Sequence, residues 1–548
     1  MVDRFEGLYP LDYKNNEFAR KISFAFETLT QNMNENNTPR FKKVKSYEDL
    51  QTKYNDLSYD GRSTDDVIKD IMDDFFQGTP RWVSPLWAYN VGTSPNLAAL
   101  VMYTMALEEN IYLINDGLSG NCSHIESILS TIFRKITGCD DMRSVFTFGG
   151  TGTNMYGMKL GLSKANKDAV LKGLSGNVKV MITKDAHYAQ VTCADWLGVG
   201  VQNIVTIDSK GLYSRIDDAE TKMRKIIESG DKIGVIIING GTTYDHAIDD
   251  IQQFRLLIDR LVEEYSLDYS PHLHVDSVIG WSWLFFKYYE FNENPLDIPM
   301  KYLVKMKKQF ERISNIKYAD SWGVDFHKGI GSCPVASSMF CVNNKSDIRY
   351  LSKKLYDGHD VHQLSPEFSS INPSEFTLET SRSAGAPLAA LASLNALGSS
   401  GYIKLLSNLL INSFELRDRL ESNPRIRVCN NESLGFCTMI RVYPSKEHKL
   451  RAIKVEQNPQ EEDFAFICEM NKYNKEFFKW DHMTRMGKNN EFEYSFTSSY
   501  KVYDNKIKLE ALKFYNVSPH FKYEHVDDIV NKLSQQLLIF EEVSELAI

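Results

Sequence analysis

The middle of the chain alternates short apolar runs with longer amphipathic segments. Continuous apolar runs are typical of strands that are buried on both faces, and they recur at 144–148, 178–182, 203–207, 234–238 and 273–275. Segments with helical spacing of apolar residues separate several of these runs, as at 154–162, 217–228 and 249–265. The alternation predicts a mostly parallel central sheet with helices on both faces, which is an α/β fold.

The two ends of the chain have a different texture. Residues 1–63 carry too few apolar positions for a core of their own, so they are expected to pack against another surface. After residue 384 come small-residue helices, a strand at 435–442 and an amphipathic helix at 525–546. The predicted division is an N-terminal extension with a substrate loop (1–94), a large domain (95–384) and a small α+β domain (385–548).

Composition narrows the class of protein. The 548 residues are 43% hydrophobic and carry a formal net charge of −9, with no basic stripe, so neither nucleic acid nor a membrane surface is an expected partner. The eight cysteines form no CxxC pair and indicate free thiols in a reducing compartment. No signal peptide or apolar membrane span is apparent, so a cytoplasmic protein is expected, and no metal site is predicted.

Candidate chemistry follows the predicted strands, at the edge where parallel sheets bind ligands. Gly149-Gly-Thr-Gly-Thr-Asn154 lies between a strand and a helix, where free backbone N–H groups can bind a phosphate. His187 follows the next strand, and its ring can stack on a flat ligand. Asn239-Gly-Gly-Thr-Thr243 permits close backbone approach. Asp276 follows a further strand and, when buried, needs a cationic partner such as a protonated pyridine.

The last motif is Asp320-Ser-Trp-Gly-Val-Asp-Phe-His-Lys328, which precedes an apolar strand at 335–342. A lysine between a histidine and turn-forming glycines can supply an amine that condenses with an aldehyde. Each motif alone has a plain structural explanation. Together, in this order, they fit a pyridoxal phosphate site.

The ordered set resembles the group II pyridoxal-phosphate decarboxylases, which include aromatic-amino-acid, tyrosine and glutamate decarboxylases. The resemblance runs from about Pro80 to Arg382. It implies a fold-type I enzyme, similar to aminotransferases, that acts as a homodimer on an amino acid. The long interval at 281–317 is nearer to the bacterial tyrosine-decarboxylase type.

The resemblance also implies roles for individual residues. Thr151, Gly152 and Thr153 would hold the phosphate with help from His327, His187 would stack on the pyridine, and Asp276 would pair with its nitrogen. Thr243 and Val278 would line the ring, and Lys328 would hold the cofactor covalently. The substrate pocket would include Trp87, Tyr89 and Asn90, and Arg382 would face the substrate or a neighbouring subunit.

The sequence departs from the family pattern at several positions. Ser277 stands where the family usually has alanine, and Thr79 stands where it has histidine. The tyrosine of the family's mobile loop is not evident, so His359 and His362 are the candidate proton donors, with Phe368 at the vacated position.

The predicted reaction is decarboxylation of an L-amino acid to an amine and CO2. The aromatic loop at 82–89 favours an aromatic, tyrosine-like substrate over glutamate. Four alternatives remain open: an aldehyde-forming decarboxylase, a glutamate or other amino-acid decarboxylase, an aminotransferase, and an inactive binding subunit with the same fold.

Overall fold

The computed structural model describes residues 8–9, 16–31, 39, 45–57, 59–76, 78–174, 176–365, 372–485, 492–503 and 505–545. The chain divides into two compact units. The first unit comprises Met1–Asn90, Val442–Lys513 and His520–Ile548, and the second comprises Val91–Arg441 and Phe514–Pro519. Each unit is described by itself below.

The second unit is built on a seven-stranded sheet with the order β2-β10-β9-β8-β7-β3-β4. β10 runs antiparallel to both of its neighbours, and the remaining pairs are parallel. Apart from the edge strand β4, these strands are almost entirely buried, as the continuous apolar runs predict. The strands are β2 (Arg143–Thr147), β3 (Val178–Thr183), β4 (Ile204–Ile207), β7 (Lys232–Asn239), β8 (His272–Asp276), β9 (Ser321–Asp325) and β10 (Ser338–Val342).

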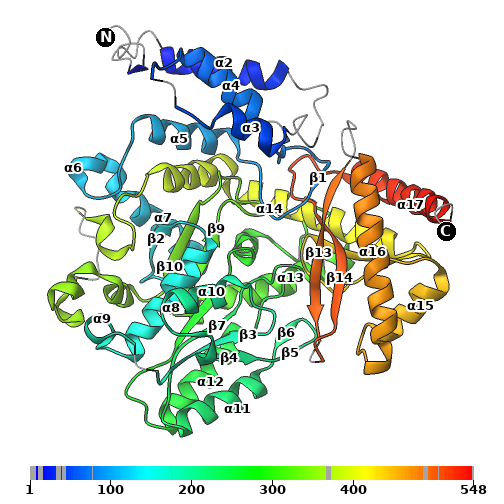
Figure 1. Ribbon diagram of the computed structural model, residues 1–548. Helices are drawn as coiled ribbons and strands as arrows, with labels where there is room; N and C mark the ends of the chain where they lie inside the picture. Colours follow the sequence, from blue (N-terminus) through cyan, green and yellow to red (C-terminus); the bar gives the residue numbers. More distant parts are fainter. Residues whose placement is uncertain are drawn as a thin grey trace. The chain divides into compact units, whose positions relative to one another are not determined.

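Helices pack against this sheet, and Figure 1 shows α8, α11 and α12 beside its strands. Met158 and Leu162 of α8 pack with Val180 and Val235 in the core. The helices of this unit are α5 (Leu97–Glu108), α6 (Asp116–Ser119), α7 (Ile125–Thr137), α8 (Gly150–Ala165), α9 (Ala169–Lys172), α10 (Ala189–Trp196), α11 (Ile216–Glu228), α12 (Ile251–Glu264), α13 (Met300–Ile313) and α14 (Gly385–Glu421).

Smaller elements complete the second unit. The long helix α14 is interrupted at Gly398, whose φ of 59° lies outside the helical region, so it forms the two helical segments that the sequence predicts. The other elements are the hairpin β5 (Ser209–Lys210) and β6 (Tyr213–Ser214), the strands β11 (Ile426–Val428) and β12 (Cys437–Val442), and the 3-10 turns η2 (Gly120–His124), η3 (Val201–Asn203), η4 (Gly280–Tyr288), η5 (Ser314–Tyr318), η6 (Lys345–Leu351), η7 (Lys353–Asp357), η8 (Val361–Gln363) and η9 (Pro373–Phe376).

The first unit combines N-terminal and C-terminal segments. β1 (Trp87–Ala88) pairs in parallel with β13 (Glu493–Val502), which pairs antiparallel with β14 (Lys508–Tyr515). Its helices are α2 (Glu17–Gln31), α3 (Tyr47–Lys53), α4 (Thr64–Phe75), α15 (Lys446–Val455), α16 (Phe464–Arg485) and α17 (Tyr523–Glu545), with the 3-10 turn η10 (Glu461–Asp463). Among the described helices of both units, none is long and apolar enough to cross a bilayer.

The predicted α/β fold class is confirmed. Three local features of the structure follow from packing and capping. The two units differ from the predicted division at residue 384, because α14 packs against α5 and η4 within the second unit. The first helix of this unit is capped by Asn96, whose side chain accepts from the N–H of Ala99. The interval at 281–317 supplies buried core, including Trp281 and Trp283.

Candidate functional site

The first turn of α8 forms one wall of the candidate site. Gly149, with φ of 132°, ends the turn after β2, and the helix begins at Gly150. The first N–H groups of a helix have no partner within it and point toward the space before the helix. A Cβ on Gly150 would come within 2.6 Å of Asp325 Oδ2, and one on Gly152 within 2.2 Å of Thr147 Oγ1. A side chain at either position would collide with these neighbours, so the backbone packs closely against Asp325 and Thr147.

The threonines of this turn differ in their surroundings. Thr151 is exposed, whereas Thr153 is fully buried and its hydroxyl donates to the carbonyl of Gly150 at 2.8 Å. A Cβ on Gly323 of β9 would touch both Thr153 Oγ1, at 2.5 Å, and Val278 Cγ1, at 3.1 Å. Thr153 and Val278 therefore lie together beside β9, and the backbone N–H groups with Thr151 are the groups of this turn that remain open to a phosphate.

Asp276 ends β8 and holds an acceptor that nothing in the described chain satisfies. Its Oδ2 accepts from Asn154 Nδ2 at 3.0 Å and from Gln190 Nε2 at 3.1 Å. Its Oδ1 is buried, and no group within the described residues hydrogen bonds to it. A buried carboxylate oxygen without a partner is costly, and a cationic N–H donor would remove that cost. This oxygen fits the protonated pyridine nitrogen of the predicted cofactor.

Lys328 is paired with a carboxylate that the sequence analysis did not single out. Its Nζ lies 2.8 Å from Oδ2 of Asp325, whose side chain is fully buried. Burial lowers the pKa of Lys328, but the charge and hydrogen bond of Asp325 outweigh it, so the net shift is upward. Ser338 Oγ donates to the other oxygen of Asp325 at 2.5 Å. The amine is thereby held at the ends of β9 and β10.

His187 is a neutral ring next to these charges. Its Nδ1 accepts the backbone N–H of Ala189 at 3.2 Å, so the neutral imidazole carries its proton on Nε2. Burial lowers the pKa of His187, Asp276 and Asp325 oppose this shift, and Lys328 reinforces it. The carbonyl of His187 accepts the N–H of Gln190 at 3.0 Å, and the Gln190 side chain bonds to Asp276, so His187 lies in the turn that also supplies a contact of that carboxylate. A neutral aromatic ring there can stack on a flat ligand.

His327 and Thr243 are the remaining residues predicted to contact the cofactor. His327 Nε2 is 3.7 Å from Asp325 Oδ2, and burial lowers the pKa of its ring. The carbonyl of Thr243 accepts a hydrogen bond from Tyr515, while its side chain is half-buried. The turn that carries Thr243 packs closely against the end of β8, since a Cβ on Gly240 would come within 2.5 Å of Ser277 Cβ. The hydroxyl of Ser277 donates to the Gly323 carbonyl at 2.7 Å, which ties β8 to β9.

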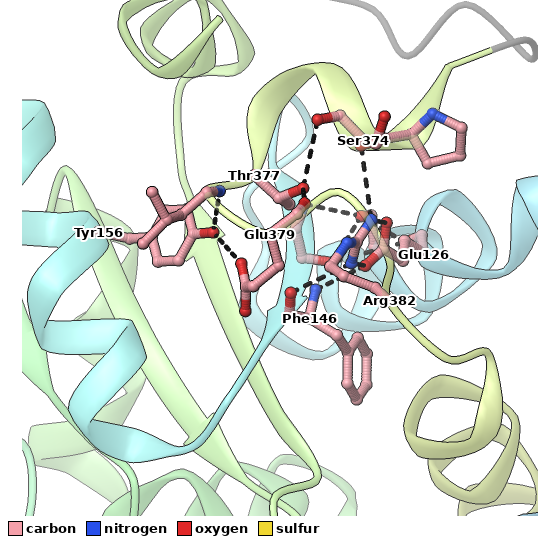
Figure 2. Close-up of polar contacts among 11 residues, drawn as sticks. Glu126, Phe146, Tyr156, Ser374, Thr377, Glu379 and Arg382 are labelled. Carbon is pink, nitrogen blue, oxygen red and sulfur yellow. Dashed lines mark hydrogen bonds and ion pairs between the residues drawn. The ribbon is translucent and has the colours of Figure 1, made fainter. Parts of the chain in front are cut away.

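Arg382 does not lie open to a ligand, in contrast to the role predicted from its motif. Figure 2 shows its guanidinium directed at Glu126, with Nη1 also donating to the carbonyl of Phe146 at 3.1 Å. The two nitrogens reach both carboxylate oxygens of Glu126, at 2.5 and 3.1 Å. The pair is buried and anchors the segment after η9 to α7 and β2. The Arg382 guanidinium is therefore already paired within this unit.

The predicted proton donors are not part of the buried cluster. His359 and His362 are exposed around η8, and within the described residues no hydrogen bond or ion pair joins either ring to Lys328, His187 or Asp276. Phe368 lies outside the described residues. A role for either histidine in proton transfer stays a prediction.

The predicted substrate loop belongs to the first unit. Trp87 is buried there and stacks on Tyr89, with ring centroids 5.1 Å apart and planes 14° apart, while Asn90 is exposed. The carbonyl of Tyr89 accepts from Ser495 Oγ at 2.7 Å. Trp87 thus has a packing role in its own unit, and substrate contact by these three residues stays a prediction.

The sequence analysis gave no role to three residues that contact Lys328 or Asp276: Asp325, Asn154 and Gln190. Asp325 had a signal, because a carboxylate three residues before Lys328 in a strand-exit motif is placed to reach the amine. Asn154 ends the glycine-rich motif, but its contact with Asp276 spans 122 residues of sequence. Gln190 has no local signal, and only the packing of α10 against α8 brings it to Asp276.

No protein-family model matches the chain. The human acidic amino acid decarboxylase is 27% identical over 160 residues, 29% of each chain. Tryptophan decarboxylase of Clostridium sporogenes is 23% identical over 350 residues, which cover 61% of this chain and 73% of that protein. The chain spans about a third of the length of the curated relatives that it matches first.

A solved structure shares the fold over nearly the whole chain. The apo form of mouse CSAD superposes with a TM-score of 0.73 at 14% identity and covers 95% of this chain and 98% of that one. The prediction of a fold shared with the group II decarboxylases is thereby confirmed.

Proposed function

We propose that the protein is a pyridoxal-phosphate-dependent decarboxylase of an L-amino acid, forming an amine and CO2. One observation carries the proposal: the buried, unsatisfied Oδ1 of Asp276 lies in the same cluster as the paired amine of Lys328. A carboxylate that needs a cationic N–H donor and an amine suited to an aldehyde are the two groups that this cofactor requires. The decarboxylases among its relatives support the same reaction.

Each residue has a role in the proposed enzyme. The bound cofactor supplies an electron sink for the bond that breaks, and Asp276 keeps its ring nitrogen protonated. The N–H groups of the first turn of α8, with Thr151, would bind the phosphate, and the neutral ring of His187 would stack on the pyridine. Lys328 would supply the amine that holds the cofactor, and Asp325 positions that amine.

The proposed substrate class is aromatic. Two observations support it: the aromatic residues of the loop at 82–89, and a relative that is a tryptophan decarboxylase by name. An acidic amino acid is the second candidate, because the first relative acts on that class by name. A site built for a second carboxylate needs a basic partner, and Arg382 is already occupied by Glu126.

We also propose that the enzyme works as a homodimer. The support is α5, which is apolar around most of its circumference and packs on one side against α14. Its other side exposes large apolar side chains that a second copy would cover: Leu97, Leu100, Val101, Met102, Met105 and Leu107.

The deciding experiment measures CO2, amine and hydrogen peroxide together. Purified protein supplied with pyridoxal phosphate is incubated with tyrosine, tryptophan, phenylalanine, glutamate and aspartate, with Lys328→Ala as the matched control. We expect equal amounts of CO2 and amine from an aromatic substrate, and none from the control. Hydrogen peroxide formed in an amount equal to CO2 would show that the enzyme forms an aldehyde and not an amine. If no amino acid releases CO2, the proposal is refuted.

A further inference from the structure

A separate cavity lies within the second unit, beside the middle of α8. Its volume is about 140 Å³. Its walls come from the middle of α8, the residue after α10, the turns η6 and η7, and Thr377–Leu378. Most of the lining is apolar or aromatic: Met155, Tyr156, Val170, Leu197, Leu351 and Leu378 contribute.

One cation faces this apolar lining without an anion. Lys159 lines the cavity, is half-buried, and has no hydrogen bond or ion pair with any described residue. Burial lowers the pKa of its ammonium group. Lys164 on the same helix differs, because its Nζ lies 2.8 Å from Asp347 Oδ2. A lysine so placed gains a partner only from outside the described chain.

Other polar side chains also line the cavity, and those of Tyr156, Ser352 and Thr377 are hydrogen bonded within the protein. Tyr156 donates its hydroxyl hydrogen to Glu379 Oε2 at 2.6 Å and accepts the N–H of Leu378 at 2.6 Å, as the tyrosine and glutamate in Figure 2 show. Glu379 is therefore turned toward Tyr156. Lys159 therefore supplies the cation of the lining, and no carboxylate of the described residues pairs with it.

We propose that this cavity binds a small arylcarboxylate, with its ring among the apolar side chains and its carboxylate on Lys159. The size agrees, since a cavity of about 150 Å³ holds one benzene ring. The chemistry agrees as well, because an ammonium group in apolar surroundings pairs strongly with a carboxylate. The proposal does not depend on the reaction at Lys328.

The test is calorimetric titration of the holoenzyme with phenylacetate, with 2-phenylethanol as the neutral probe of the same ring. We expect one saturable site, at least tenfold weaker binding in Lys159→Met, and recovery to within a few-fold in Lys159→Arg. Phenylethanol should bind at least tenfold more weakly. Lys172→Met is the matched control, because Lys172 is exposed and pairs with Asp168.

A second variant separates this cavity from the cofactor site. Val170→Trp fills the cavity without touching a residue of the cofactor site, and it should remove the phenylacetate site while borohydride still fixes pyridoxal phosphate to the protein. Absence of saturable binding, or binding that survives both Lys159→Met and Val170→Trp, would overturn the proposal.

Discussion

Strands β8 and β9 carry ionisable groups at both of their ends, and the two ends differ in how those groups are satisfied. At the amino ends, Asp320 Oδ2 accepts the N–H of Leu273 at 2.7 Å and lies 3.3 Å from Arg255. His272 bonds to Ser321 Oγ at 2.7 Å. At the carboxyl ends, Asp276 keeps a buried oxygen without a partner among the described residues.

The comparison shows why a cluster of ionisable side chains is not by itself a ligand site. His272, Asp320 and Asp347 offer ligand atoms within 4.8 Å of one another, which is a spacing that could hold a metal. Lys164 and Arg255 already neutralise the two carboxylates there. The carboxylates of the amino-end cluster are therefore already paired with cations, whereas Asp276 at the carboxyl ends keeps an unmet acceptor.

The largest effect on activity is expected at the carboxyl ends of β8 and β9. Asp276→Asn removes the charge that would hold the cofactor's ring nitrogen protonated, so the rate of decarboxylation should fall by about a thousandfold or more. The amide keeps the shape and the thermal stability should change little. Steady-state kinetics and a melting curve check both statements, and near-normal turnover would remove Asp276 from the site.

At the amino ends of β8 and β9, Asp320→Asn should lower the stability of the protein. Burial raises the pKa of Asp320, but Lys164, His272 and Arg255 lower it further, so the net shift is downward and the carboxylate is charged at neutral pH. Removing the charge leaves Lys164 and Arg255 with one carboxylate fewer and should cost roughly 3 kcal/mol of unfolding free energy. Denaturant unfolding measures the loss. A fall in turnover at unchanged stability would contradict the comparison.

Asp325→Asn tests a positioning role. The variant keeps the hydrogen bond to Ser338 but loses the charge that holds the amine of Lys328. We expect cofactor uptake by the apoenzyme to slow by about tenfold, and the pH at which Lys328 loses its proton to fall, because Asp325 raises its pKa. Stopped-flow absorbance after mixing with pyridoxal phosphate follows both. Ser338→Ala is the control that removes the supporting hydrogen bond alone.

The smallest effect concerns the histidine between the two ends. His274 Nδ1 bonds to Ser321 Oγ at 2.8 Å, and burial lowers its pKa to about 4. Because the unfolded chain binds a proton near pH 6.5 and the folded one does not, stability is lost as the pH falls from about 6.5 to about 4. His274→Asn should remove up to about 1.4 kcal/mol per pH unit from that slope. An unchanged slope would mean that His274 is not buried in the neutral form.

Sequence patterns predicted the motifs at the carboxyl edge because each follows a strand, and the end of a parallel strand sets where the next residue lies. β9 was not predicted, since its Gly323 weakens the strand pattern. That glycine is required by the close approach of Thr153 and Val278. The pairing of Arg382 with Glu126 was not predicted, because the two residues lie 256 positions apart in sequence. Long-range pairs of this kind arise from packing and leave no local signal.

The central claim is that Lys328 and the unsatisfied oxygen of Asp276 form one cofactor site. Its most direct test is borohydride reduction of the protein after addition of pyridoxal phosphate, followed by peptide mass spectrometry. We expect a single modified peptide that contains Lys328, and weaker labelling in Asp276→Asn at limiting cofactor concentration. Modification of a different lysine, or no modification of Lys328, would contradict the account.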